Sequence, residues 1–114
     1  MAQLPRETSP TMSRPRTARR AQARALEKLA TQREKLARLE TGGAPDHPVV
    51  VESASQVEVH ARSLRCVRCD GSYRLDEHLA ETIGGERLRV ARLVCPACGA
   101  RRSVYFRIAP TRVN

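Results

Sequence analysis

The chain has 114 residues, of which 40% are hydrophobic and 3% aromatic, so it is too short for a large catalytic scaffold and has few bulky side chains for a core. Its 21 Lys and Arg residues against 12 Asp and Glu give a net charge of +9, which favours polyanionic partners. A GC-rich genome produces the same richness in Arg and Ala without selection for nucleic acid. Uninterrupted apolar runs such as residues 49–51 are far too short to span a membrane, and the N-terminus lacks a signal-peptide pattern. We therefore expect a cytoplasmic protein with no membrane partner.

The positive charge is concentrated near the N-terminus. Residues 1–41 hold ten basic and four acidic side chains, whereas residues 42–114 hold eleven and eight. Residues 1–16 contain three prolines and show no apolar periodicity, which is typical of a segment that cannot bury enough surface to fold. We predict a disordered basic arm over these residues.

Residues 17–41 form the clearest predicted helix, because strong helix formers dominate and neither Gly nor Pro occurs before the glycine pair at 42–43. We expect Thr17 to act as N-cap and Glu34 to pair with Arg38 across one turn. The glycine pair predicts a left-handed stop.

An apolar stripe runs along this predicted helix, and it has three interpretations. It can dock on the protein's own sheet, it can associate with a second copy or with a partner protein as a short coiled coil, or the helix can lie along nucleic-acid phosphates. The stripe comprises Ala18, Ala25, Leu26, Leu29, Leu36 and Leu39.

Strand-like patterns begin after a Pro/Gly linker over residues 42–48. Apolar and polar side chains alternate over residues 57–62 and again over residues 103–108, which predicts two half-buried strands. We place a metal-stapled domain over residues 49–110, followed by a tail at 111–114.

All the cysteines of the chain fall into two pairs, each with two residues between its members, and a 25-residue spacer separates the pairs. Two such turns facing each other present four thiolates to one tetrahedral Zn²⁺, so we predict a single structural zinc ion. The predicted ligands are Cys66, Cys69, Cys95 and Cys98.

Other uses of the cysteines fit the sequence less well. A thioredoxin-type redox pair requires a βαβ context, structural disulfides suit a secreted chain, and haem attachment requires a His after the pair. A zinc deaminase requires an H-x-E motif that is absent around His78. Four thiolates leave no open metal position for a water molecule, so we expect no enzyme activity, while metal release on oxidation remains an alternative.

The spacer between the cysteine pairs predicts a β-hairpin. If Gly84 and Gly85 form a two-residue turn, every pair of facing residues has numbers that sum to 169, which places Leu79 opposite Val90 and Glu77 opposite Arg92. The same register places Leu75 opposite Val94 and Cys95 opposite Arg74. The alternative is a helix over residues 75–83, where Leu75, Leu79 and Ile83 recur at four-residue steps.

This combination of two Cys-x-x-Cys knuckles with antiparallel strands resembles the zinc-ribbon superfamily over about residues 57–109. The resemblance implies an antiparallel β zinc ribbon. Together with the N-terminal α-helix that the periodicity predicts, this gives a small α+β protein. Gly99 follows the second pair where the knuckle favours a small residue, whereas Asp70 occupies the corresponding position of the first pair and tolerates the left-handed region.

We expect the protein to bind nucleic acid or a nucleoprotein complex through its basic arm and helix. The arginines that precede the first helical acid, and those from Arg101 onward, which follow the last acid of the chain, are expected to be unpaired and free to contact phosphates. The candidates are Arg14, Arg16, Arg19, Arg20, Arg24, Arg101 and Arg102. The alternative is a protein-interaction adaptor that uses the leucine stripe and the edge of the sheet.

Overall fold

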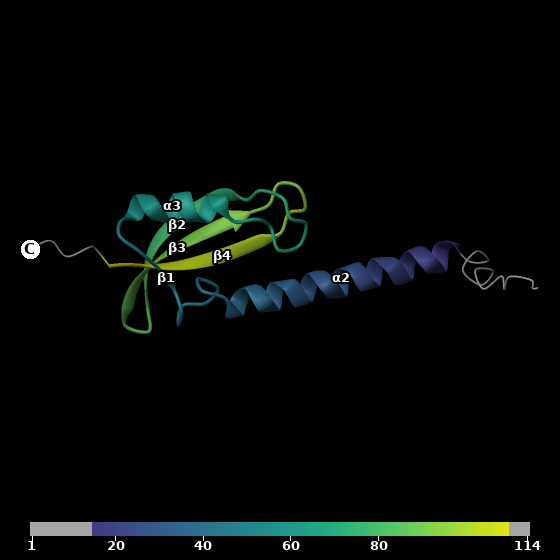
Figure 1. Ribbon diagram of the computed structural model, residues 1–114, viewed down its shortest axis with the longest axis horizontal. Helices are drawn as coiled ribbons and strands as arrows, with labels where there is room; N and C mark the ends of the chain where they lie inside the picture. The colour runs from purple at the N-terminus through teal and green to yellow at the C-terminus, as the bar shows by residue number, and fades with distance from the viewer. Residues whose placement is uncertain (1–14, 110–114) are drawn as a thin grey trace, which may run out of the picture.

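The computed structural model describes residues 15–109, which form two helices and one four-stranded sheet (Figure 1). The elements are α2 (Pro15–Leu39), β1 (Val49–Val51), α3 (Ala54–Ser63), β2 (Arg74–Ile83), β3 (Glu86–Val94) and β4 (Arg101–Ile108). The sheet has the order β1-β4-β3-β2, in which β1 runs parallel to β4 and the other pairs are antiparallel. The predicted α+β class is confirmed. Most of the predicted arm, including Arg14, and the predicted tail lie outside the described residues.

α2 begins and ends slightly earlier than the sequence predicts. Pro15 occupies its first turn, where the missing amide hydrogen would have no partner inside the helix in any case. Thr17 therefore lies within the helix, and its prediction as N-cap is wrong. After Leu39 the chain turns, and Gly42 has a φ of +90°, which confirms the predicted left-handed stop.

The C-terminal half of α2 packs on the rest of the protein through small side chains. Ala30 and Ala37, two helical turns apart, are only 8% and 4% exposed. The leucines of the predicted stripe point elsewhere, since Leu29 is 45% exposed and Leu39 76%. The interpretation in which this stripe docks on the protein's own sheet is therefore wrong, because the side chains that the rest of the protein covers are alanines on another face of the helix.

The predicted linker after α2 is folded against the edge of the sheet. The Gly42 N–H donates to the His47 carbonyl at 2.7 Å, and the Tyr105 N–H of β4 donates to the Gly42 carbonyl at 2.8 Å. A Cβ atom on Gly42 would lie 2.7 Å from Cγ2 of Val49, so both the close approach and the positive φ require glycine. The loop thus fixes the end of α2 beside β4.

Residues 57–62 are helical, so the predicted strand at this position is wrong. They belong to α3, in which Val57 and Ala61 are fully buried one turn apart, while Val59 is 72% exposed. The same apolar residues fit a two-residue and a four-residue repeat, and the tertiary structure decides between them. The sheet needs a cover for the face that carries Leu93 and Phe106, and α3 supplies it (Figure 1).

The hairpin of β2 and β3 is confirmed, and the alternative helix over residues 75–83 is wrong. Leu79 faces Val90 and Glu77 faces Arg92, as the register predicts from the two-glycine turn. The register shifts by one residue between Leu75 and Glu77, so Leu75 faces Leu93 and the predicted pairs beyond this point are wrong. A β-bulge at Asp76 accounts for the shift.

A single core joins the sheet, α3 and the two inner cysteines. Phe106 and Leu93 are its largest fully buried side chains, and Cys66 and Cys95 belong to the same cluster. The cysteine site is therefore continuous with the core of the domain. Neither α2 nor α3 combines the length and apolar character that crossing a membrane requires.

Candidate metal centre

The two cysteine pairs lie in loops that have the same hydrogen-bonded turn. Cys66 N–H donates to Gly71 O and Asp70 N–H to Cys66 O, at 2.7 and 2.8 Å. The second loop repeats this pattern, since Cys95 N–H donates to Ala100 O at 2.8 Å and Gly99 N–H to Cys95 O at 2.7 Å. The fourth residue after the first cysteine of each pair is left-handed, with a φ of 66° at Asp70 and 80° at Gly99. The expectation that Asp70 tolerates this conformation is confirmed.

The turns bring the four predicted ligands together. All four sulfur atoms lie within 4.8 Å of one another, with 3.6 Å between those of Cys66 and Cys98 and 3.4 Å between those of Cys69 and Cys95. A tetrahedral site with Zn–S bonds of about 2.3 Å places its sulfurs about 3.8 Å apart, whereas a disulfide bond is about 2.05 Å long. The cluster therefore fits one tetrahedral ion and contains no disulfide.

Gly71 shows how closely the backbone encloses the sulfurs. A Cβ atom at this position would lie 3.2 Å from the sulfur of Cys69 and 3.3 Å from that of Cys95. Sulfur has a large radius, so a side chain here would push the two knuckles apart. The glycine is a feature of the site that the sequence analysis did not identify.

The thiols influence one another strongly. Burial of Cys66 opposes its ionisation, but hydrogen bonds from the Cys69 and Arg68 N–H groups stabilise the thiolate, and the pKa falls to about 7. For Cys69 the Gly71 N–H lowers the pKa, but the neighbouring thiols outweigh it and raise the pKa to about 12. One thiolate therefore suppresses the ionisation of the others, and a bound divalent cation would remove this penalty.

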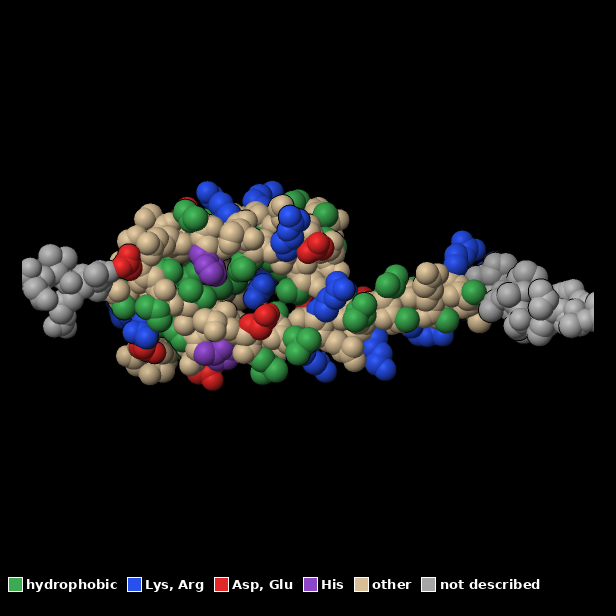
Figure 2. Space-filling model, viewed as in Figure 1, with side chains coloured by type: hydrophobic (Ala, Val, Ile, Leu, Met, Phe, Trp, Pro, Cys, Tyr) green, Lys and Arg blue, Asp and Glu red, His purple; other side chains and the backbone are tan. Residues whose placement is uncertain are grey.

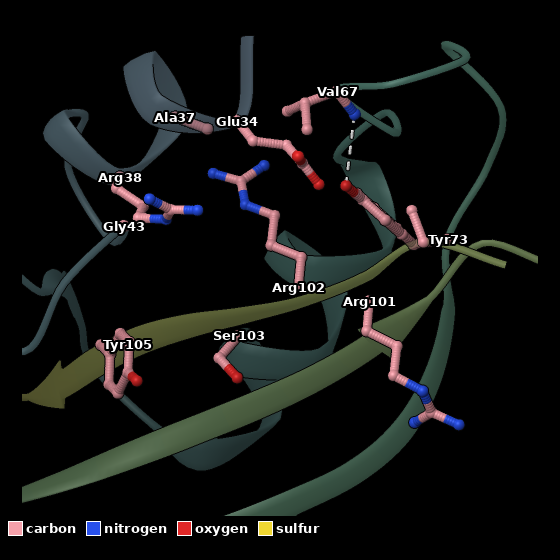
Figure 3. A pocket seen from close by; sticks show the side chains of 11 residues that line it. Glu34, Ala37, Arg38, Gly43, Val67, Tyr73, Arg101, Arg102, Ser103 and Tyr105 are labelled. Atoms are coloured by element: carbon pink, nitrogen blue, oxygen red, sulfur yellow. Dashed lines mark hydrogen bonds between the residues drawn. The ribbon is translucent and has the colours of Figure 1, made fainter. Parts of the chain in front are cut away.

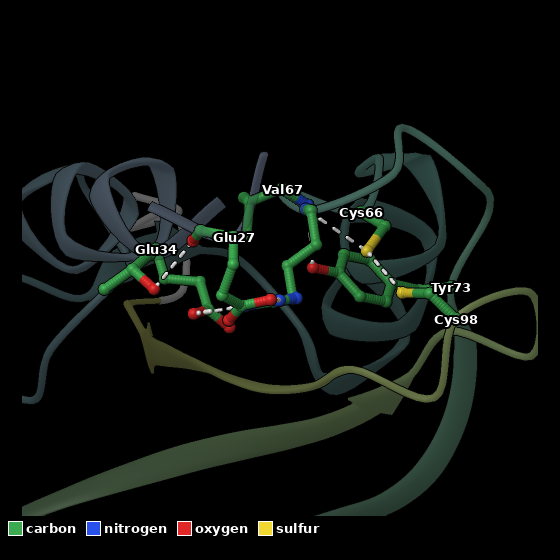
Figure 4. A network of polar contacts seen from close by, with 8 residues as sticks. Glu27, Glu34, Cys66, Val67, Tyr73 and Cys98 are labelled. Carbon is green, nitrogen blue, oxygen red and sulfur yellow. Dashed lines mark hydrogen bonds and ion pairs between the residues drawn. The ribbon is translucent and has the colours of Figure 1, made fainter. Parts of the chain in front are cut away.

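A second contact joins the first knuckle to α2. Arg68 stands between the two cysteines of the first pair, and its Nη2 and Nη1 atoms lie 2.6 Å from Glu27 and 3.0 Å from Glu34 (Figure 4). The hydrogen bond to Glu27 raises the pKa of Arg68, and the negative charges of Glu27 and Glu34 raise it further. The same hydrogen bond lowers the pKa of Glu27. We call this contact the Arg68 clamp. It ties the direction of α2 to the loop that carries two metal ligands.

The sequence analysis missed this clamp, and it predicted a different partner for Glu34. The expected pair between Glu34 and Arg38 is absent from the described residues, because Glu34 turns toward Arg68. A signal was available in the sequence, since Glu27, Glu34 and the buried alanines lie on one face of the helix.

Tyr73 supports the same knuckle from beneath. Its side chain is 6% exposed, and its hydroxyl accepts a hydrogen bond from the Val67 N–H at 3.2 Å (Figure 4). Burial raises the pKa of Tyr73, so the hydroxyl keeps its proton.

The predicted phosphate-binding arginines fall into two separate groups. Those on α2 are all exposed, and no described carboxylate lies within ion-pair distance of them. This group comprises Arg16, Arg19, Arg20 and Arg24. On β4, Arg101 lies 3.6 Å from Asp76, whereas Arg102 is half-buried against the C-terminal half of α2.

Two other expectations about charge can be compared with the structure. Arg107 lies 3.5 Å from Glu86, so it and Arg101 are paired, contrary to the prediction. The predicted cross-strand pair of Glu77 and Arg92 is present at 3.8 Å.

Comparison of the chain with models of known families, with curated proteins and with solved structures finds no match in any of the three. The functional argument therefore rests on the cysteine cluster and on the surfaces around it.

Proposed function

We propose that the protein is a non-enzymatic, zinc-stapled module that binds nucleic acid through the N-terminal half of α2. The observation that carries this proposal is that residues 16–29 are all exposed and include four arginines without an acidic partner among the described residues. In Figure 2 this segment extends beyond the body of the molecule and carries blue side chains in several directions. A cationic helix that extends away from its own domain is accessible to a polyanion.

The spacing of the cations supports contact with a phosphate backbone. Arg16, Arg20, Arg24 and Lys28 recur at four-residue steps, which places successive cations about 6 Å apart along the helix axis. One strand of a duplex carries a charge every 3.4 Å or so of its axis, so each cation can meet a different phosphate. Such contacts give affinity that depends little on sequence and falls steeply with salt.

The aromatic residues argue against a single-stranded ligand. Stacking platforms require exposed rings, but Phe106 is fully buried and Tyr73 is 6% exposed. Tyr105 lies beside the α2 loop. A duplex or a structured RNA is therefore the better ligand class.

Zinc has a structural role in this proposal. The four thiolates satisfy the tetrahedral preference of Zn²⁺ and leave no position for a substrate or a water molecule. The metal would hold the knuckles together, and the Arg68 clamp would set the direction in which α2 leaves the domain.

The exposed leucines favour a second candidate, a partner-protein helix. Leu26 and Leu36 are each 62% exposed, so an apolar face is available. A second copy of α2 is a poor occupant, because α2 carries eight basic and two acidic residues and two copies would repel each other. A protein partner would therefore have to be acidic.

Titration of the zinc-loaded full chain with a DNA duplex and with a structured RNA, at several salt concentrations, tests the proposal. We expect Arg20→Gln combined with Arg24→Gln to weaken binding to both and to reduce the salt slope by about two, one for each lost phosphate contact. Arg74→Gln combined with Arg87→Gln is the matched control, because it removes two charges from exposed positions of the hairpin. If the α2 double variant and the hairpin double variant weakened binding equally, the proposal would be contradicted. Binding that survives high salt would contradict it as well.

A further inference from the structure

A cavity of about 210 Å³ lies between the C-terminal half of α2, the first knuckle and β4. Its lining contains three arginines and one glutamate. Figure 3 shows the guanidinium groups of Arg38 and Arg102 extending into the space between α2 and β4, whereas that of Arg101 points away. The cavity is therefore lined by cations from two different elements.

The charges of this cavity are not balanced by the protein. Arg101 lies 3.6 Å from Asp76 and has its partner there. Glu34, the one carboxylate of the lining, lies 3.0 Å from Arg68, which it shares with Glu27, so its charge offsets part of the positive charge of the cavity. No described carboxylate lies within 4.0 Å of the guanidinium groups of Arg38 or Arg102. Two positive charges thus face one cavity, and Arg102 is half-buried there. Removing a cation from water without a counterion is unfavourable, and an anion in the cavity would relieve that cost.

The neutral groups of the lining divide between the two faces of β4. Ser103 and Tyr105 alternate with Arg102 along the strand, so their side chains lie on the opposite face, whereas the Tyr73 hydroxyl lies on the side of Arg102 (Figure 3). The Tyr73 hydroxyl accepts its hydrogen bond from Val67, so its own proton is free to be donated. The two arginine forks, with the Tyr73 hydroxyl beside them, match the oxygen atoms of a tetrahedral oxyanion.

We infer that this cavity is a binding site for a phosphate monoester. A phosphate monoester carries a charge of about −1.5 to −2 at pH 7, which matches two arginines better than the single charge of a carboxylate does. A free nucleotide and the 5′-phosphate at the end of a nucleic acid both present this group. The inference does not depend on the helix contacts proposed above, because the cavity lies on the opposite end of α2 from Arg16, Arg20 and Arg24.

Calorimetric titration of the zinc-loaded full chain with inorganic phosphate, and then with adenosine 5′-monophosphate, tests the inference. We expect saturable binding that Arg102→Gln weakens about tenfold or more, the factor expected when a charge-assisted hydrogen bond is lost. Arg38→Gln should cause a similar loss from a different element, which excludes a folding defect confined to β4. Arg101→Gln is the matched control, since it lines the same cavity but pairs with Asp76, and it should leave the affinity unchanged within about twofold.

A pair of DNA duplexes, one with a 5′-phosphate and one with a 5′-hydroxyl, identifies the source of the phosphate group. Tighter binding of the phosphorylated duplex that Arg102→Gln abolishes would assign the site to nucleic-acid ends. Equal binding of the two duplexes, with binding of the monophosphate retained, would assign it to free nucleotides. The inference is overturned if the wild-type protein fails to bind phosphate at millimolar concentration, or if Arg101→Gln and Arg102→Gln weaken binding equally. Loss of duplex binding in the α2 double variant with phosphate binding intact would separate this site from the proposed function.

Discussion

The two halves of α2 share one helix but differ in what surrounds them. In the half that ends at Leu39, Ala30 and Ala37 pack on the domain and Glu34 is neutralised by Arg68. In the half that begins at Pro15, every described side chain is exposed and the charged residues before Glu27 are all arginines. Alanine and glutamate side chains attach the C-terminal half to the domain, so the basic N-terminal half extends into solvent. A single helix can therefore serve both as part of a fold and as a binding surface.

Loss of the metal is the change with the largest expected effect, because both halves depend on the knuckles. A structural zinc site contributes folding free energy on the order of 10 to 16 kcal/mol in zinc-finger peptides. We expect Cys95→Ser, which replaces a fully buried ligand, to abolish the cooperative unfolding transition of the sheet. Circular dichroism during a thermal melt, with zinc content measured on the same sample, checks this.

Removal of zinc from the wild-type protein with a chelator should have the same effect and should be reversed by adding zinc back. Replacement of Ser72 by Ala, close to the knuckle but outside the ligand set, is the control and should leave the transition in place. An unchanged melt without metal would show that the core alone stabilises the fold.

A bulky residue on the docked face comes next in expected effect. Ala37→Arg places a long cation where the side chain is 4% exposed and lines the same cavity as Arg102. Overpacking in a filled site costs about 1 to 3 kcal/mol, so the C-terminal half of α2 should detach while the sheet stays folded. Amide hydrogen exchange checks this through faster exchange in residues 30–39.

Ala25→Arg makes the same substitution on an exposed position of the free half. It should leave both the exchange rates of residues 30–39 and the melting temperature unchanged. Equal effects of the two substitutions would mean that the halves of α2 do not differ as the structure describes.

The sequence predicted the hairpin and the ligand set but not the docked face. Glycines at the turn and a cysteine spacing set by metal chemistry are local features, so they can be read from one segment. The Arg68 clamp joins residues that are far apart in the chain, since Arg68 lies 34 positions after Glu34 and 41 after Glu27. The helix α3 was missed for a related reason, because the apolar spacing of Val57 and Ala61 fits a strand and a helix until the sheet supplies a surface.

Removal of the Arg68 clamp should have a smaller effect on stability than on geometry. Arg68→Ala removes an exposed ion pair with Glu27 and a half-buried one with Glu34, and ion pairs this close to solvent contribute little to folding stability. We expect a nearly unchanged melting temperature together with a broader distribution of α2 orientations. Spin labels on α2 and on the hairpin, with distances from pulsed electron resonance, measure that distribution.

Arg65→Ala is the matched control for this variant. Arg65 lies on the same loop, and its side chain donates a hydrogen bond to the Asp70 carbonyl at 3.4 Å but pairs with no carboxylate among the described residues. If the distance distribution of Arg68→Ala is as narrow as that of the wild type, the alanine contacts alone orient the helix.

The most direct measurement is an amide NMR footprint of the zinc-loaded full chain during titration with a DNA duplex that has 5′-hydroxyl ends. We predict chemical-shift changes concentrated in residues 16–28, decreasing toward residue 39, with the amides of β2 and β3 unchanged. A footprint on β2 and β3, or changes confined to the residues around Leu36 and Leu39, would contradict the proposal that the basic half of α2 is the binding surface.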